Sequence, residues 1–303
     1  MDLKILITGA NGLTGTKLVR KINELGWDYL ATSAGACRLD LGFPVSYAKL
    51  DITDEVAVFK LGMEYRPTHI INAAAMTLVD ECEDHQVRCD RINVDGVLNG
   101  LRLAEEIDAH YIQISTDFIF SGEDGPYTEA STPDAKGYYA LSKWKAEQLC
   151  HKASCKTSIC RTAIVYGHEK HLSRGNVVRW LTDELRAGKA VNMVEDQFRN
   201  PTWAEDLATL LTLVVEFRAD GIFNTTGGEF MSMLELARRI ARFAGADEGL
   251  ISPIATATLG RKAPRPPSTQ MIIEKARKEL GYRPHTLEEA LTIMDRQIAG
   301  NWS

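Results

Sequence analysis

The stretch KILITGANGLTG, from Lys4 to Gly15, decides the fold on which the rest of the chain builds. The apolar run that ends at Thr8 predicts a buried strand, and the residues after Gly15 combine helical periodicity with good helix formers. Between strand and helix, glycines recur at every third position. Glycine permits a tight turn, lets the backbone approach a pyrophosphate, and leaves the amides at the helix start free to bind an anion. The stretch predicts a dinucleotide site, although a glycine triplet alone also suits a loop with positive φ angles.

Strands and helices alternate through the first half of the chain. Apolar runs predict strands at 27–32, 47–50, 69–72, 111–115 and 157–165, separated by helical patterns such as 55–64, 91–106 and 138–151. Such alternation predicts an α/β fold, a Rossmann-like doubly wound parallel sheet with helices on both faces. From residue 168 onward separate helices and loops follow, and three S/T-x-x-E boxes predict helix starts at Thr202, Ser232 and Thr286.

Length and composition fit one large domain or two moderate ones, because the chain has 303 residues and 45% of them are hydrophobic. We expect a dinucleotide-binding domain over residues 1–167, joined by elements from about 202–225. A smaller mixed substrate-binding region is expected over residues 168–303.

Charge and cysteine usage narrow the classes of function. The formal net charge is −6, which gives no support for a nucleic acid or an anionic membrane as partner. The longest apolar stretch, 207–215, is far shorter than the roughly 20 residues of a membrane span, and the first residues do not resemble a signal peptide. The six cysteines form no C-x-x-C pair, which favours reduced thiols and no metal site. We therefore expect a cytoplasmic protein.

Two residues on one predicted helix form a candidate acid/base pair. Tyr139 and Lys143 are four residues apart, so they share a helix face. A neighbouring ammonium lowers the pKa of a phenol and suits it to proton transfer. Thr116, at the end of a predicted strand, adds a hydroxyl at the edge where parallel sheets bind ligands. The alternative is a surface pair without function.

The end of the second strand bears on the choice of cofactor. An NAD-binding fold usually has an Asp or Glu there for the ribose hydroxyls, whereas this chain has Thr32 and Ser33. Arg38 follows within reach of a 2′-phosphate, although an ordinary solvated loop residue is equally compatible. The position favours NADPH, with NADH left open.

The motifs together resemble those of the extended short-chain dehydrogenases/reductases, and within that group the dTDP-4-dehydrorhamnose reductase family. The similarity covers nearly the whole chain. It rests on the opening glycine stretch, Asp51-Ile52, Asn72 to Ala75, STDFIFSG at 115–122, YALSKWKAE at 139–147, RTAIVYG at 161–167, DQFRNPT at 196–202 and Arg265-Pro266.

The resemblance assigns roles position by position. It implies that Tyr139 is the catalytic acid, with Lys143 and Thr116 beside it. With Ser33 and Arg38 added from the preceding argument, the expected cofactor-binding residues are Gly9, Asn11, Gly12, Leu13, Gly15, Ser33, Arg38, Asp51, Ile52, Ala73, Ala74, Ala75 and Lys143. The expected substrate-binding residues are Thr116, Asp117, Tyr139, Ile164, Arg199 and Arg265.

The implied activity is reduction of a 4-keto-6-deoxy sugar nucleotide, above all of dTDP-4-dehydrorhamnose to dTDP-L-rhamnose, by hydride transfer from NADPH. Dehydration is disfavoured because Phe118 follows Asp117 where the resembling dehydratases have Glu. Ile164 and Met76 depart from the usual Trp and Tyr, which leaves another nucleotide sugar open. An epimerase with the same three residues is a further alternative, although a tightly held, recycled NAD fits poorly with the missing carboxylate at the second strand. We expect Arg261, Lys262 and Arg265 to lie in a loop that meets the substrate's diphosphate, with surface solvation as the alternative.

Two further alternatives concern partners. The methionine adenosyltransferase beta subunit shares the fold and many motifs, so a non-catalytic NADP-binding regulatory subunit is the competing hypothesis. The helices at 91–106 and 138–151 are those that pair in dimers of such reductases, so a homodimer is compatible with the sequence. Leu98, Leu101 and Trp144 on these helices would then be either dimer contacts or core.

Overall fold

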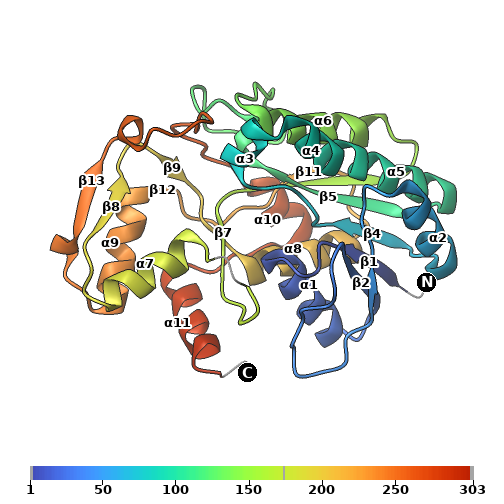
Figure 1. The fold of residues 1–303 in the computed structure, drawn as a ribbon, viewed down its shortest axis with the longest axis horizontal. Helices are drawn as coiled ribbons and strands as arrows, with labels where there is room; N and C mark the ends of the chain where they lie inside the picture. Colours follow the sequence, from blue (N-terminus) through green and yellow to red (C-terminus); the bar gives the residue numbers. More distant parts are fainter. Residues whose placement is uncertain (1–2, 173–174, 301–303) are drawn as a thin grey trace.

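The strand predicted before the glycine turn, β1 (Lys4–Thr8), lies inside a seven-stranded parallel sheet (Figure 1). The computed structural model describes residues 3–172 and 175–300. The strand order is β11-β6-β5-β4-β1-β2-β3, with every neighbouring pair parallel. The other strands are β2 (Asp28–Ser33), β3 (Tyr47–Lys49), β4 (His69–Asn72), β5 (His110–Thr116), β6 (Thr157–Thr162) and β11 (Gly221–Asn224). The predicted α/β, Rossmann-like fold class is confirmed.

The strand order places a crevice beside β1. The chain runs from β1 outward to β2 and β3 on one side, and then returns to β4 on the other side. Where the order reverses in this way, the loops that leave two neighbouring strands diverge and open a crevice at the carboxyl ends. The glycine turn after β1 and the alanines after β4 border that crevice.

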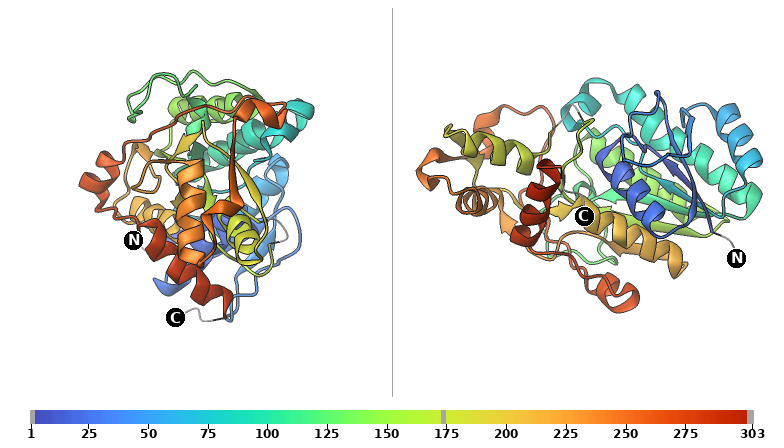
Figure 2. Two further views of the ribbon diagram at one scale, coloured as in Figure 1. Left: turned by 90° about the vertical axis from the view of Figure 1, so that its left-hand side faces the viewer. Right: turned by 90° about the horizontal axis from the view of Figure 1, so that it is seen from below.

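Helices cover both faces of the sheet, because alternate side chains of a buried strand point to opposite faces. Ile5 and Ile7 pack against one group of helices, and Leu6 packs against the other. The first group is α1 (Leu13–Glu24), α8 (Ala204–Glu216) and α10 (Glu274–Leu280). The second is α2 (Glu55–Tyr65), α5 (Gly96–Ile107) and α6 (Tyr138–Lys152). Figure 2 shows α1 and α8 side by side beneath the sheet.

A second lobe with its own core lies beyond the carboxyl edge of the sheet, at the left of Figure 1. Its helices are α7 (Val177–Arg186), α9 (Met233–Ala244) and α11 (Leu287–Ile298). Three two-stranded sheets complete it: β7 (Val165–Tyr166) with β10 (Thr202–Trp203), β9 (Phe198–Arg199) with β12 (Met231–Ser232), and β8 (Val191–Val194) with β13 (Ile251–Ile254). Side chains of Ser232 and Thr286 cap α9 and α11 as predicted, whereas α8 begins after Trp203 without a side-chain cap.

Two predicted elements differ from the structure. The strand expected at 157–165 ends at Thr162 and resumes as β7, because Ile164 has a left-handed backbone with φ 39°. The helix expected at 91–106 is one part of a longer run: α4 (Gln86–Asp90), a π-helical turn η1 (Arg91–Asp95) and α5. On these helices Leu101 is buried in the core and Trp144 packs against a small buried cluster beside it. Core packing therefore accounts for both residues.

Candidate active site

Two glycines of the turn lie in close contact with neighbouring backbone. Gly9 has φ 69°, and a Cβ there would lie 2.6 Å from the backbone of Ala73. A Cβ on Gly15 would lie 2.4 Å from the carbonyl oxygen of Gly9. Helix α1 begins at Leu13, so the amides of its first turn have no partner within the helix and point to the crevice. Only glycine fits these two positions, and the helix start remains open to an anion.

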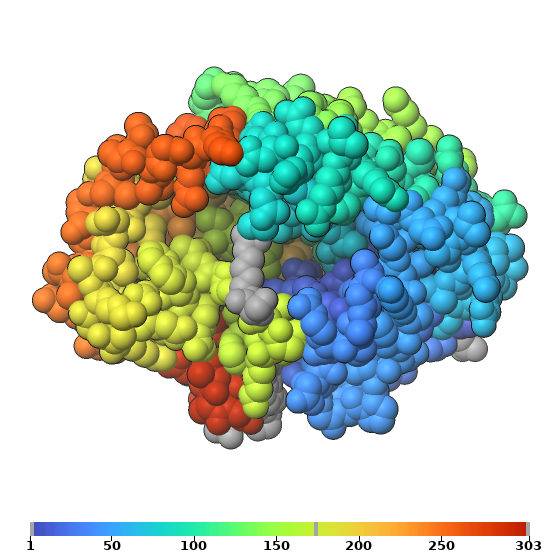
Figure 3. Space-filling model, in the orientation of Figure 1, coloured from blue at the N-terminus to red at the C-terminus, as the bar shows by residue number. Residues whose placement is uncertain are grey.

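A cleft of about 560 Å³ opens above this turn. Figure 3 shows the hollow between the blue-to-teal cofactor half and the yellow-to-orange second lobe. Its wall brings together residues that are far apart in the sequence. The predicted site residues that line it are Gly12, Leu13, Gly15, Ala73, Ala74, Ala75, Thr116, Asp117, Tyr139, Lys143 and Ile164.

A second group of predicted cofactor residues lies beside the turn. The backbone amide of Asn11 donates to Ser33 Oγ at 3.0 Å. Its side chain accepts from the amide of Arg38 at 3.0 Å and donates to the carbonyl of Ala36 at 2.9 Å. Asn11 therefore holds the loop after β2 next to the start of α1, where the adenosine end of a dinucleotide would lie.

Asp51 and Ile52 follow β3 at the same edge. Asp51 is exposed and accepts a hydrogen bond from the amide of Thr53 at 2.9 Å. Ile52 is buried against Gly96, where a Cβ would lie 2.6 Å from Cδ1 of Ile52. Neither residue lines the main cleft.

The candidate acid and its neighbours meet at the base of the cleft. Helix α6 carries Tyr139 and Lys143 on one face, and the end of β5 carries Thr116. Lys143 Nζ donates to the carbonyl oxygen of Ile114 at 2.7 Å. Burial lowers the pKa of Lys143 to about 8, although the charge of Glu147 opposes the shift. The three side chains line the same cleft, and Tyr139 and Lys143 share a helix face as their spacing predicts.

Burial changes the pKa of the Tyr139 phenol more than neighbouring charges do. Burial raises the pKa of Tyr139, and its hydrogen bond with Thr116 opposes only part of the rise. The sequence analysis expected the Lys143 ammonium to lower this pKa. In the structure desolvation dominates, so the phenol stays protonated at neutral pH and is suited to donate a proton.

Asp117 and Arg199 form a buried pair behind the cleft wall. Arg199 is only 1% exposed, and its Nε lies 3.5 Å from Oδ2 of Asp117. The guanidinium also donates to the carbonyls of Phe198 and Pro267, at 2.7 and 3.2 Å. Asp117 lines the cleft, whereas Arg199 does not. Arg199 thus fixes Asp117 and the loop at 266–268, and its donors are directed to Asp117 and to backbone carbonyls.

Arg265 likewise lies outside the cleft lining. Its Nη2 is 3.0 Å from Oδ2 of Asp80, a residue of α3 (Val79–Asp84). Lys262 Nζ is 2.7 Å from Oδ1 of Asp84 on the same helix. The loop that the sequence assigned to a substrate diphosphate is therefore paired with carboxylates of the cofactor half.

Comparison with known proteins decides the family. The model of the RmlD substrate binding domain matches residues 3–299. The chain belongs to this family. It is therefore an NAD(P)-dependent reductase of the RmlD family, and the resemblance seen in its motifs is confirmed.

RmlD relatives of several kinds align over most of the chain. The spore coat polysaccharide biosynthesis protein SpsK of Bacillus subtilis is 29% identical, with 95% of each chain covered. Methionine adenosyltransferase 2 subunit beta of Bos taurus is 27% identical, over 86% of this chain and 78% of that protein.

Two solved dTDP-4-dehydrorhamnose reductases each cover 98% of this chain and 100% of theirs. The one from Clostridium acetobutylicum is 28% identical with a TM-score of 0.86. The one from Bacillus anthracis, in complex with NADP, is 26% identical with a TM-score of 0.85.

This RmlD-family chain also contains a positioning residue that sequence reasoning missed. Asn93 lies in the π-helical turn η1 and is 1% exposed. Its Oδ1 accepts from the amide of Met76 at 2.8 Å, and its Nδ2 donates to Ser142 Oγ at 3.0 Å. Asn93 thereby ties the cleft loop after β4 to the helix that carries Tyr139. No spacing rule signals a π-helical turn, so the sequence offers no means of finding this contact.

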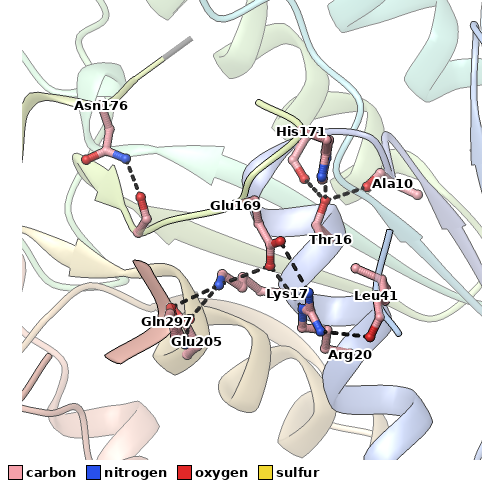
Figure 4. A network of polar contacts seen from close by, with 12 residues as sticks. Ala10, Thr16, Lys17, Arg20, Leu41, Glu169, His171, Asn176, Glu205 and Gln297 are labelled. Carbon is pink, nitrogen blue, oxygen red and sulfur yellow. Dashed lines mark hydrogen bonds and ion pairs between the residues drawn. The ribbon is translucent and has the colours of Figure 1, made fainter. Parts of the chain in front are cut away.

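A buried ionic network joins helix α1 to the second lobe (Figure 4). Lys17 Nζ lies 3.1 Å from Oε1 of Glu169 and 2.7 Å from Oε1 of Glu205. Gln297 of α11 donates to the same Glu205 oxygen at 2.7 Å, and Arg20 pairs with Glu169 at 3.1 Å. The two carboxylates are thus neutralised by cations of α1.

Residues 3–172 and 175–300 provide neither a cluster of metal-ligating side chains nor a helix that could span a membrane. No group of three or more His, Cys, Asp or Glu side chains is placed to hold a metal ion. Over the same residues, no helix combines the length and apolar character that crossing a membrane requires.

Proposed function

We propose that this chain reduces the 4-keto group of a dTDP-linked 6-deoxy sugar with NADPH, and that dTDP-4-dehydrorhamnose is its substrate. The observation that carries the proposal is the convergence of Thr116, Tyr139 and Lys143 at the base of a cleft that begins at the glycine turn. The RmlD family and the dTDP-4-dehydrorhamnose reductases of similar structure support the substrate class.

The residues of the turn fit a dinucleotide. Gly9 and Gly15 allow a close approach of backbone segments that any side chain would prevent, and the start of α1 from Gly12 to Gly15 lines the cleft, where its amides are available to an anion. Ser33 occupies the position at the end of β2 where NAD-binding proteins usually have a carboxylate, which would repel a 2′-phosphate. The backbone amide of Arg38 donates to the side chain of Asn11, so Arg38 lies in the same region. This arrangement supports NADPH as the preferred donor. When bound, the cofactor supplies a hydride to the ketone carbon.

The side chains of the cleft then stabilise and protonate the ketone oxygen, on which negative charge develops. Tyr139, kept protonated by burial, donates its proton to the ketone oxygen, and Thr116 donates a hydrogen bond to the same oxygen. Lys143, held by the Ile114 carbonyl, has further ammonium protons for the nicotinamide ribose. Phe118 packs edge-on against Tyr139 with ring centres 6.0 Å apart, so it covers the acid on one side. Ile164 and Asp117 complete the wall of the sugar pocket.

The neighbouring tyrosines supply the test and its control. Tyr139→Phe removes the acid but not the ring, so turnover is expected to fall by at least about 10²-fold while NADPH still binds. Tyr138→Phe is the matched control, because the Tyr138 hydroxyl donates to Asp90 at 2.7 Å. NADPH oxidation with dTDP-4-dehydrorhamnose is followed at 340 nm, and NADPH binding by fluorescence. A Tyr139→Phe protein that keeps wild-type turnover would refute the assignment.

A panel of substrates separates the proposed reductase from its alternatives. dTDP-, UDP- and GDP-linked 4-keto sugars are assayed with NADPH and NADH in parallel, and the fastest pair is expected to be the dTDP sugar with NADPH. Similarity to methionine adenosyltransferase 2 subunit beta favours one competing function, a regulatory NADP-binding subunit. Cofactor binding without turnover of any 4-keto sugar would support that alternative.

A further inference from the structure

The helix that carries the proposed acid has no cap of its own. Helix α6 begins at Tyr138, one residue before Tyr139, and Gly137 precedes it. A helix start usually has a side chain that accepts a hydrogen bond from an amide of the first turn, and Gly137 offers none. Any other residue is disfavoured there, because φ of Gly137 is 85° and a Cβ would lie 3.1 Å from the ring of Pro264. A side-chain acceptor for this turn therefore has to come from elsewhere in the fold.

Glu83 of α3 supplies that acceptor. Its Oε1 accepts a hydrogen bond from the backbone amide of Tyr138 at 2.6 Å. A Cβ added to Gly137 would lie 3.0 Å from the same oxygen, so the carboxylate lies directly against the helix start. Glu83 and Tyr138 are 55 positions apart in the chain, and the packing of α3 against α6 brings them together (Figure 1). The helix dipole adds to this contact, because a negative charge is favoured at a helix N-terminus.

Other residues of α3 fix Glu83 relative to the cleft. Val79, the first residue of the helix, lines the cleft wall. Cys82 is fully buried in a small apolar cluster, against which Tyr139 packs. Met76, from the loop after β4, belongs to the same cluster. Glu83 is thus presented by a short helix that contacts both the cleft and the side chain of the proposed acid.

The phenol depends on the first turn of α6 more than Lys143 does. Tyr139 is the second residue of the helix, and helix ends fray when their amides lack partners. Lys143 lies one turn further on, where its Nζ donates to the Ile114 carbonyl at 2.7 Å. Losing the Glu83 acceptor would therefore loosen the Tyr139 phenol but leave the Lys143 ammonium in place. A misplacement of about 1 Å can cost roughly 10²-fold in rate.

We propose that Glu83 is a positioning residue for the reduction: its carboxylate caps α6 from α3 and thereby holds the Tyr139 phenol at the ketone oxygen. Glu83 does not line the main cleft, so it acts through Tyr139 and touches neither substrate nor cofactor. This inference rests on the proposed function and adds a residue to it. The competing interpretation is a cap that stabilises the helix alone, and it predicts a lower free energy of unfolding with no change in the chemical step.

Substitutions of Glu83 separate the two roles. Glu83→Ala removes the acceptor, so kcat with the dTDP-linked 4-keto sugar is expected to fall about tenfold, while the Kd of NADPH changes by less than about twofold. Glu83→Gln keeps an acceptor oxygen and is expected to restore most of kcat. Glu81→Gln is the control, because it removes an exposed charge from the same helix and should leave kcat unchanged. Wild-type kcat in Glu83→Ala, whatever its stability, overturns the proposal.

A double variant shows whether Glu83 acts through the phenol. In the Tyr139→Phe background, Glu83→Ala has no acid left to displace. The residual turnover is therefore expected to stay within about twofold of that of Tyr139→Phe alone. A further loss of about tenfold, which independent residues would give, contradicts the positioning role.

Hydrogen exchange of the NADPH-loaded chain tests the contact without turnover. The Tyr138 amide is expected to exchange at least about tenfold faster in Glu83→Ala, and at about the wild-type rate in Glu83→Gln. If the wild-type protein reduces the dTDP sugar but neither kcat nor exchange responds to Glu83→Ala, the positioning role is wrong and the proposed function stands. If the wild-type protein reduces no 4-keto sugar, both are overturned, whatever the exchange shows.

Discussion

Replacing Lys17 with methionine removes the cation from the network that joins α1 to the second lobe. The Lys17 side chain is 1% exposed, and the Glu169 side chain is 2% exposed. Arg20 would still pair with Glu169, whereas Glu205 would lose the Lys17 ammonium and keep its hydrogen bond from Gln297. Removing one partner of a buried ion pair typically costs about 3–5 kcal/mol, because the remaining charge is left unpaired. Arg20 limits the loss at Glu169, and the Glu205 side chain is 22% exposed, so we expect a smaller loss of about 2 kcal/mol.

Urea unfolding followed by circular dichroism measures this loss. The double variant Lys17→Met/Glu205→Gln removes both charges and is expected to regain about half of the lost free energy of unfolding. Lys21→Met is the matched control on the same helix, because its pair with Glu24 is exposed, and about 0.5 kcal/mol is expected. A Lys17→Met loss below about 1 kcal/mol, or a double variant no more stable than the single one, would refute the reasoning.

Two further predictions concern pH. Burial lowers the pKa of His69 to about 4 and that of His110 to about 3, from 6.5. The unfolded chain therefore takes up protons first as the pH falls below about 6.5, and stability should decline towards pH 4, by roughly 2 kcal/mol per imidazole at pH 5 in urea titrations. His69→Phe should flatten this decline, and an unchanged slope would contradict it. Glu147→Gln removes the charge that raises the Lys143 pKa, so the alkaline limb of kcat/KM, expected near pH 8, should move down by about one pH unit. An unmoved limb in the pH–rate profile would show that Lys143 is not the titrating group.

The sequence predicted those features that depend only on residues close together in the chain: the glycine turn, the Tyr139–Lys143 pair and two helix caps. The glycine turn follows from the close approach of Gly9 and Gly15 to backbone, and the pairing of Tyr139 with Lys143 follows from helical spacing. Both motifs line one cleft in the structure. The S/T-x-x-E boxes at Ser232 and Thr286 also form caps, since a cap depends only on residues within one turn.

Contacts between distant segments could not be predicted in this way. Arg199 lies on a two-residue strand, where no alternation indicates which side chain points inward, and it turns to Asp117. Arg265 pairs with Asp80 across 185 positions of sequence. Asn93 depends on a π-helical turn, which local composition does not reveal. The sequence therefore identified the residues at the cleft, but not the side chains that hold them in place.

The position of α8 and β11 in the sheet layer limits how the lobes can be separated. Both come from residues 204–224, after the chain has already entered the second lobe at β7. A fragment that stopped at β6 would leave that strand without its neighbour β11 and uncover the apolar side of α1. No single cut divides the molecule into two folding units. Because α10 also packs on the sheet, grafting the substrate lobe onto another cofactor domain would require three discontinuous segments: one before α8, one between β11 and α10, and α11 after α10.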